Sequence, residues 1–413
     1  MAFLEGNALF RNLYCLLAGN SGNAQHCGRD GLLPAGWEWL AFALVGFAIT
    51  FLLLSAFLLL TMFYTYLERR LLGRFQGRIG PNRAGPFGLL QPVADAIKLL
   101  TKESIVPQGA DWLLYNLAPL MMVVVMFMVL AVIPFGKHTF IADLNVGVLF
   151  IIAVTSVNAL AVFMAGIASG NRYALFGGMR AVAQLISYEV PMVLSIVGVL
   201  LLAGSLSLVE IVEAQVIPFF LLQPLGLFIF VVSASAEMNR PPFDQLEAES
   251  EIVAGYHTEY GGMKFGLFYL AEYAAVLTTS GVIATLFLDG WEGPLLPSHV
   301  WFLMKVFFLA FIFIWVRATL PRVRIDQTMA FAWKFLLPLG IINVFMTAAE
   351  LLLFGHEEAG GQGIVLSTAD LWLMSVVNFA VAVVGIGAFS RLVSLRTPAL
   401  PVSAPKPSAA EVV

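Results

Sequence analysis

Long apolar runs separated by shorter polar segments fill most of the chain, a pattern typical of a polytopic membrane protein. A helix of about 20 mainly apolar residues is long enough to cross a bilayer. By this measure we predict about nine transmembrane helices, at residues 39–67, 113–133, 146–169, 180–203, 219–237, 264–287, 299–318, 335–354 and 370–390. The first run exceeds the length that a bilayer requires, so we expect that helix to be tilted.

The composition supports a membrane protein and argues against several other classes. Hydrophobic residues make up 60% of the 413 residues, and the 12% of charged residues is about half the share in soluble domains. The net charge of −4 argues against a generally basic nucleic-acid-binding protein. With two cysteines, the chain cannot hold an iron–sulfur cluster by four thiolates, and it has no glycine-rich phosphate-binding motif. We therefore expect no metal site, and we expect any redox cofactor to lie on another chain.

The distribution of Lys and Arg predicts the orientation of the chain. Of the 22 basic residues, 18 fall on one set of segments, which we assign to the cytoplasmic side. Only Arg11, Arg29 and Lys137 fall on the other side, so the N-terminus is expected outside and the C-terminus inside. Cys15 and Cys27 then both lie outside, where the sequence is compatible with either a disulfide or two unpaired thiols.

The predicted fold is an all-α polytopic membrane protein with long structured cytoplasmic loops, placed in the inner (plasma) membrane of a cell. Its parts are an external segment at 1–38, a single membrane domain at 39–390 and a disordered cytoplasmic tail at 391–413. The cytoplasmic loops of the membrane domain are 68–112, 170–180, 238–264 and 319–334. Because the external connections are mostly short, we expect function to lie at the cytoplasmic face.

The first cytoplasmic loop is rich in Gly, Pro and Arg and is followed by an amphipathic segment at 91–102. In a helix, the apolar Val93, Ile97 and Leu100 share one face, and Asp95 lies on another face with Lys98 and Lys102. Such a helix is typical of one that lies on the membrane surface. A simple interfacial anchor explains the apolar face, but it does not require an acid among basic residues.

The loop at 238–264 is densely acidic for a chain with so few charges. Within it, Pro241 and Pro242 stop the preceding helix, and a D-x-x-E capping box at Asp244 starts a short new one. The acids are interleaved with apolar side chains, which indicates partial burial rather than a solvated acidic loop. Carboxylates clustered in this way raise one another's pKa values and can share protons.

Three acids and one base lie within predicted spans, where a charge costs roughly 3 kcal/mol to insert. Glu189 and Glu272 lie well inside their spans and are functional candidates. Glu350 and Lys305 lie near the outer ends of theirs, where each could instead reach the headgroups. A further basic segment around Arg317 can be read as a topology signal, as a neutraliser of the acidic loop, or as an anion-binding group.

Several stretches carry most of this unusual composition: GRIGPNRAGPFGLLQPVADAIKLLTKE, SYE, EMNRPPFD, EAESE, GYHTEYGGMKF, AEY and WVRATLPRVRIDQ. Together they closely resemble the membrane subunit of respiratory complex I that sits under the peripheral arm, the H subunit of bacterial enzymes. The resemblance runs from about Glu68 to Pro338, in the expected order. One departure is Gln245, which stands where an apolar residue is common in the family.

The resemblance implies a membrane subunit of a proton-translocating NADH-quinone oxidoreductase. Members of this family carry no redox centre and form most of a narrow chamber in which quinone, the substrate, meets an iron–sulfur cluster of a neighbouring subunit. FMN and the iron–sulfur clusters are implied on partner subunits of the peripheral arm. Antiporter-like membrane subunits and membrane lipids are the other implied partners, and nucleic acid is not one.

The matching motifs also imply roles for individual residues. The quinone chamber would be lined by Arg69, Asp95, Lys98, Phe268, Tyr269, Arg317 and Arg322. An acidic path from the chamber toward the antiporter-like subunits would comprise Glu189, Glu237, Asp244, Glu247, Glu249, Glu251, Glu259 and Glu272. Interface or structural roles would fall to Glu68, Arg180, Arg240, Arg324 and Asp326.

Two other functions compete with this interpretation. One is the equivalent subunit of a membrane-bound hydrogenase or of a complex fed by another electron donor, which this chain alone separates poorly. The other is an independent secondary transporter with buried acids as its proton sites. A transporter does not need long, folded, Gly- and Pro-rich cytoplasmic loops, and it would purify alone rather than with iron–sulfur proteins.

The predicted orientation can be tested with reporter fusions. A reporter fused after Pro134 and one fused after Gly355 should both read as external, because both positions follow an odd number of crossings from an internal loop. A cytoplasmic signal from either fusion would contradict this topology.

Overall fold

The computed structural model describes residues 13–15, 38–137, 139–245, 254–357, 364–365 and 367–392. Within these ranges, eight helices are long and apolar enough to cross a membrane, which confirms the all-α polytopic fold. Their elements are α3 (Glu38–Phe75), α5 (Trp112–Val132), α6 (Gly147–Ala168), α7 (Arg172–Ala203), α12 (Gly262–Phe287), α13 (Ser298–Thr319), α14 and α15 (Ile325–Phe331 and Leu337–Phe354, joined by the π-helical turn Ala332–Leu336), and α16 (Thr368–Leu392). The strands described, β1 (His356–Glu357) and β2 (Ile364–Val365), form a small hairpin between α15 and α16.

The segment predicted as a span at 219–237 is divided into two helices, α9 (Phe219–Leu222) and α10 (Pro224–Glu237). Gln223 between them has non-helical angles, φ −129° and ψ 55°. Proline cannot donate the backbone hydrogen bond that would continue the helix, and it disfavours a helical residue before it. Alone, α10 is about 21 Å long, shorter than the roughly 30 Å hydrocarbon core, so this crossing is discontinuous.

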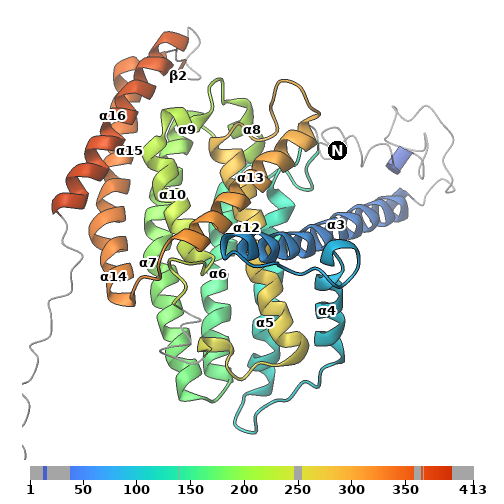
Figure 1. Ribbon diagram of the computed structural model, residues 1–413. Helices are drawn as coiled ribbons and strands as arrows, with labels where there is room; N and C mark the ends of the chain where they lie inside the picture. The colour runs from blue at the N-terminus through green and yellow to red at the C-terminus, as the bar shows by residue number, and fades with distance from the viewer. Residues whose placement is uncertain are drawn as a thin grey trace, which may run out of the picture.

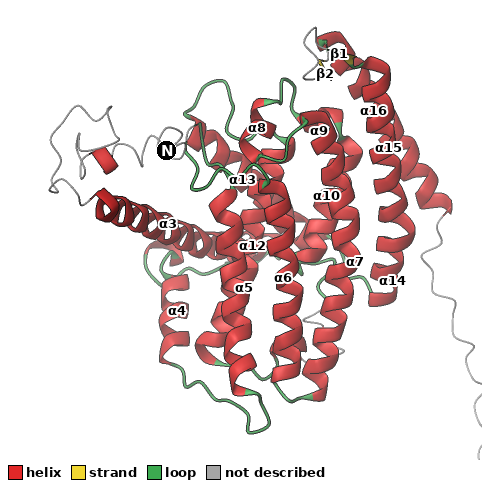
Figure 2. Cartoon of the chain, turned by 180° about the vertical axis from the view of Figure 1, so that it is seen from behind, coloured by secondary structure: helices red, strands yellow, loops and turns green. Residues whose placement is uncertain are grey.

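Helix α12 lies at the centre of the bundle. In its most apolar stretch 83% of the residues are buried within the protein, against 17% in α3. Figure 1 shows α15 and α16 on one flank and α3 extending from the opposite flank at a steep angle to the other helices, as expected for a tilted helix. Figure 2 shows the same arrangement from behind, with α5 and α6 side by side; α12 packs against α5.

Two helices differ from their predicted bounds in a way that affects the site. α7 begins at Arg172 rather than at 180, because the Asn171 side chain accepts a hydrogen bond from Tyr173 N and caps the helix. α3 continues to Phe75, so Glu68 and Arg69 lie on a helix rather than in a loop. Both extensions convert predicted loop into rigid helix that can position charged side chains.

The amphipathic segment forms the helix α4 (Gln91–Thr101), which packs against α3 and α12. Its Val93, Ile97 and Leu100 are 42–64% exposed, so the apolar face is turned away from the bundle. The preceding turn η1 (Pro86–Gly88) needs a glycine at 88, where φ is +81° and an added Cβ would lie 2.3 Å from the Pro81 carbonyl oxygen. The Gly- and Pro-rich loop is therefore folded tightly against the bundle.

Other predictions concern short segments and ends of the chain. Two short helices, α8 (Leu208–Glu213) and η2 (Gly255–His257), lie between longer ones.

Cys15 is disulfide-bonded, while Cys27 lies outside the described residues, as do most of the N-terminal segment and the tail. Glu247, Glu249 and Glu251 also lie outside them, so their predicted roles stay predictions.

Candidate functional site

A cavity of about 940 Å³ lies between α3, α4 and α12. Its residues are Thr61, Met62, Thr65, Arg69, Pro92, Asp95, Ala96, Lys98, Leu99, Phe265, Gly266, Tyr269, Leu270 and Tyr273. Charged side chains come from the C-terminal part of α3 and from α4, and aromatic side chains come from α12. The cavity therefore combines apolar and aromatic walls with a few charged groups, which is typical of a small-molecule site.

Asp95 is held in this cavity by two basic residues and an amide. Its carboxylate lies 2.6 Å from Arg69 Nη1 and 3.5 Å from Lys98 Nζ, and it accepts a hydrogen bond of 3.3 Å from Gln91 Nε2. Burial favours the neutral acid, but the hydrogen bond and charge of Arg69 outweigh it and hold the pKa of Asp95 below its usual value. Asp95, which a simple interfacial anchor does not require, is thus an ionised group in the cavity wall.

Behind the cavity lies a buried group of charges, Glu68, Arg240, Glu272 and Arg317, which we call the Arg240 cluster. Glu68 is 1% exposed, and its Oε1 accepts hydrogen bonds from Arg240 Nη1, at 2.7 Å, and from Arg317. Arg240 Nε lies 3.0 Å from Glu272 Oε1 as an ion pair. Two carboxylates and two guanidinium groups thus balance one another in charge.

Tyr273 connects the cavity with the Arg240 cluster. Its ring lines the cavity, and the Arg240 guanidinium carbon lies 4.4 Å from the ring centroid. An arginine over an aromatic face is stabilised by the ring quadrupole. A change of charge in the cavity is therefore separated from Arg240 by a single aromatic side chain.

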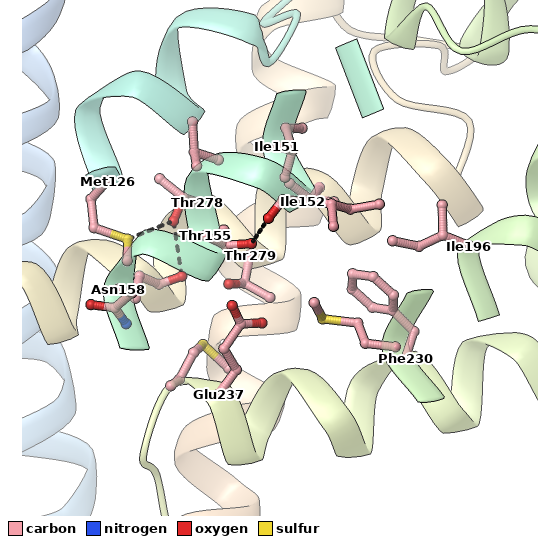
Figure 3. A pocket seen from close by; sticks show the side chains of 15 residues that line it. Met126, Ile151, Ile152, Thr155, Asn158, Ile196, Phe230, Glu237, Thr278 and Thr279 are labelled. Carbon is pink, nitrogen blue, oxygen red and sulfur yellow. Dashed lines mark hydrogen bonds between the residues drawn. The ribbon is translucent and has the colours of Figure 1, made fainter. Parts of the chain in front are cut away.

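Two further cavities continue from the Arg240 cluster into the bundle. The first, about 370 Å³, is lined by both Glu272 and Glu237. The second, about 560 Å³, shares Glu237 and Asn158 with the first and extends past Thr155 between α6, α7, α10 and α12. Figure 3 shows the Glu237 carboxyl group pointing into this cavity toward Thr155 and Thr279.

Glu189 extends this series of acids to α7. Its Oε1 accepts a hydrogen bond from the Ser156 hydroxyl, on the residue next to Thr155, and it is close enough to Glu237 to interact electrostatically. Among the described residues, no salt bridge joins Glu189 or Glu237 to a base. Glu272 and Glu237 thus line the first cavity together, and Glu189 interacts with Glu237 beside the second cavity, whose walls are mostly apolar.

The start of the acidic loop is fastened to the segment between α13 and α14. Arg322 Nη2 lies 2.6 Å from Asp244 Oδ2, so this arginine does neutralise an acid of the loop. Gln245, which departs from the family pattern, is 5% exposed and donates hydrogen bonds to the Val323 carbonyl, at 2.9 Å, and to Thr328. An amide here fixes the loop where an apolar side chain could only pack.

The structure brings only some of the predicted chamber residues together. Arg69, Asp95, Lys98 and Tyr269 line the cavity. Phe268, 2% exposed, instead packs edge-on against Tyr260, while Arg317 and Arg322 pair with the acids described above. Sequence reasoning missed Phe265 and Tyr273 in the cavity wall, although they lie in GYHTEYGGMKF and AEY, at helical spacing from Tyr269.

The remaining predicted residues lie at the edges of the site. Glu259 accepts a hydrogen bond of 2.7 Å from Asn171 Nδ2 and so holds the loop at the start of α7 rather than lining the acidic cavities. Arg324 and Asp326 are exposed at the start of α14, and Arg180 lies on α7. Within the described residues, no group of three or more His, Cys, Asp and Glu could hold a metal ion.

The other two charges predicted within spans each have hydrogen-bond partners on neighbouring segments. Lys305 Nζ donates to the carbonyl oxygens of Leu288, Asp289, Gly290 and Glu292 at 2.7–3.2 Å, so it turns to the loop after α12. Glu350 is 3% exposed and accepts a hydrogen bond of 2.7 Å from Asn378 Nδ2 on α16.

Residues 48–348 match the family described as NADH dehydrogenase. A protein of Dehalococcoides mccartyi is 59% identical over 292 residues, which are 71% of this chain and 83% of that protein. One of Syntrophobacter fumaroxidans is 49% identical over 328 residues, 77% of this chain and 99% of its own. One of Geobacillus kaustophilus is 49% identical over 319 residues, 76% and 95% respectively. All three are named as the H subunit of NADH-quinone oxidoreductase.

The Arg240 cluster predicts the effect of removing one of its charges. Glu68→Gln leaves the buried Arg240 and the partly exposed Arg317 with one carboxylate, and breaking a buried pair such as Arg240–Glu68 costs about 3 kcal/mol or more. We expect the purified protein to unfold at a lower temperature and to accumulate less in membranes, whereas Glu103→Gln, at an exposed acid, should have no effect.

Adding Arg317→Gln to the Glu68→Gln variant restores the balance of charge and should recover part of the lost stability. If Glu68→Gln is as stable as Glu103→Gln, the cluster does not hold the fold together.

Proposed function

The chain belongs to the NADH dehydrogenase family that includes the H subunit of NADH-quinone oxidoreductase, and we propose that it is the membrane subunit that holds quinone during its reduction in such an enzyme. It would act within a multisubunit complex in the plasma membrane, with its C-terminus in the cytoplasm. Electrons would come from iron–sulfur clusters and FMN on peripheral-arm subunits docked on the loops that carry Asp95 and Asp244. Antiporter-like membrane subunits would lie beyond the acidic cavities.

One observation carries this proposal: the 940 Å³ cavity has a charged end and an aromatic wall. A quinone headgroup offers a flat ring, which suits Tyr269 and Phe265, and two carbonyl oxygens, which suit donors such as Arg69 and Lys98. The adjacent apolar face of α4 is exposed, which gives an isoprenoid tail a surface continuous with the bilayer.

Coupling follows from the protons that reduction consumes. A reduced quinone must gain two protons in a site with little water, and the carboxylates behind the cavity can supply them. A net change of one charge near the Arg240 cluster acts on Glu272 and Glu237 across short distances, where in a medium of low dielectric it matters by several kcal/mol. The series from Glu272 through Glu237 to Glu189 would carry that change into the bundle.

The cavity can be tested through Arg69. Arg69→Gln removes a donor and also releases the pKa of Asp95 upward, because the guanidinium holds it low. We expect lower quinone reductase activity of the assembled complex and an acid limb of its pH profile displaced to higher pH, since Asp95 then loses its charge sooner as the pH falls. Asp95→Asn should also lower activity, but its pH profile should not show the displaced acid limb, because no carboxylate remains at position 95.

Electron transfer from NADH to an artificial acceptor on the peripheral arm serves as the internal control. It should be unchanged in both variants and in Arg78→Gln, which alters an exposed arginine outside the cavity. If both activities fall together, these residues serve assembly and not the quinone site.

The acidic path can be tested with Glu189→Gln. The amide can still accept the hydrogen bond from Ser156, but it cannot take or release a proton. We expect quinone reduction and proton pumping to fall together in sealed vesicles, whereas Ser156→Ala, which removes the hydrogen bond and leaves the carboxylate, should retain most of both. Normal turnover with a normal pH gradient in Glu189→Gln would end the proton-path hypothesis.

A further inference from the structure

A second polar region lies on the far flank of the bundle, between α15, α16 and the break that separates α9 from α10. On α15, Asn343, Thr347 and Glu350 follow one another at intervals of four and three residues, so they share one face of the helix. All three are buried, at 4%, 0% and 3% exposure. This face runs from the middle of α15 to its last turn, at the end of the bundle opposite the cavity that holds Asp95 (Figure 1).

The inner end of this polar face is fixed at the helix break. Asn343 Nδ2 donates to Gln223 Oε1 at 2.8 Å, and Gln223 Nε2 donates to Thr347 Oγ1 at 2.5 Å. Gly198 of α7 has to be small here, because an added Cβ would lie 2.6 Å from Gln223 Oε1. Irregular backbone at membrane depth is tolerated only where it is buried in protein or lines a polar path.

The outer end of the polar face holds an incompletely satisfied carboxyl group. Glu350 Oε2 accepts a hydrogen bond of 2.7 Å from Asn378 Nδ2, but Oε1 is buried and has no hydrogen-bond partner among the described residues. An isolated carboxylate is costly to bury in an apolar medium, and a group in this position binds a proton instead. Glu350 lies four residues before the end of α15 at Phe354, about 6 Å along the helix axis, so water at that end is near.

The charged groups on the surrounding helices lie far from this position. Glu350 is the one charged residue of α15, and the charges of α16, Asp370 and Arg391, lie near its two ends. On α10 the single charge is Glu237, roughly 20 Å along the helix from the break at Gln223. The outer half of α7, from Val190 to Ala203, is uncharged. Among the described residues of these four helices, neither a base nor a second acid therefore lies beside Glu350.

The same geometry disfavours a metal cation as the ligand. A cation of the calcium type takes six or more oxygen ligands. Here the described groups offer one carboxylate, and the Asn378 amide presents its N–H side to it. A single proton on Oε1 needs no such shell of ligands.

We propose that Glu350 is a proton-binding site, separate from the quinone cavity, that exchanges its proton with water on the side of the membrane opposite that cavity. Asn378 stabilises the charged form by its hydrogen bond, and the apolar surroundings stabilise the neutral form. The two effects oppose each other, so the site can load and unload. This proposal does not rest on the quinone-binding function, because it concerns other helices and the other end of the bundle.

The test uses dicyclohexylcarbodiimide, a hydrophobic reagent that adds to protonated carboxyl groups, on the assembled complex in native membranes over a range of pH. Peptide mass spectrometry then measures the labelled fraction of Glu350. We expect labelling that declines as the pH rises, and loss of the label in Glu350→Gln. Glu213, an exposed acid on the same side, should react only with a water-soluble carbodiimide.

Variants of Asn378 separate a proton site from a merely structural contact. Asn378→Ala removes the donor that favours the charged form, so the midpoint of labelling should move to higher pH. Asn378→Ser keeps a donor and should return the midpoint toward that of the natural protein. Quinone reductase activity, measured in parallel, distinguishes failure of this proposal from failure of the quinone site.

Two results would overturn the proposal. Absence of label on Glu350 at every pH, in both the natural protein and Asn378→Ala, would mean that the acid is permanently ionised. A labelled fraction that does not change with pH, or a midpoint that Asn378→Ala leaves in place, would mean that the acid is a fixed hydrogen-bonding group and exchanges no proton.

Discussion

The structure depends on one constraint, that ionised side chains inside an apolar bundle must be balanced by opposite charge. The Arg240 cluster meets it with two acids and two bases that share contacts, since Glu68 Oε1 serves both Arg240 and Arg317. Its members come from α3, from the loop after α10, from α12 and from α13. Because no member can leave without exposing an uncompensated charge, the cluster fixes four distant segments relative to one another.

That arrangement also places the cavity. Glu68 is followed directly by Arg69 on α3, and Glu272 is followed by Tyr273 on α12. When Glu68 and Glu272 turn inward to Arg240, their neighbours on the two helices are set where they line the cavity beside α4. The helices α3 and α12 thus carry both the acids that balance charge behind the cavity and the side chains that line it.

The sequence was sufficient for most of the helices and for four residues of the cavity, Arg69, Asp95, Lys98 and Tyr269, because apolar length and local motifs are read directly from it. We missed the break at Gln223, because the apolar length of the run 219–237 outweighed the signal of Pro224, which disfavours a helical residue before it. The sequence could not show that Arg317 turns to Glu68, a partner 249 residues away, rather than into the cavity. Such pairings are set by tertiary packing, which leaves no trace in local spacing. Glu350 illustrates the same limit. Its hydrogen-bond partner Asn378 lies on the next helix, α16, so local sequence does not reveal that its carboxyl group is buried.

The buried and partly buried acids described above fall into two kinds according to their neighbours. Glu68, Asp95 and Asp244 each form an ion pair with a guanidinium group. Glu189, Glu237 and Glu350 instead contact hydroxyl or amide groups, and among the described residues none of the three forms an ion pair. Glu272 stands between the two kinds, because it shares Arg240 with Glu68. Arg240 is therefore the group through which a change of charge at the cavity can act on the acids that have no ion-pair partner.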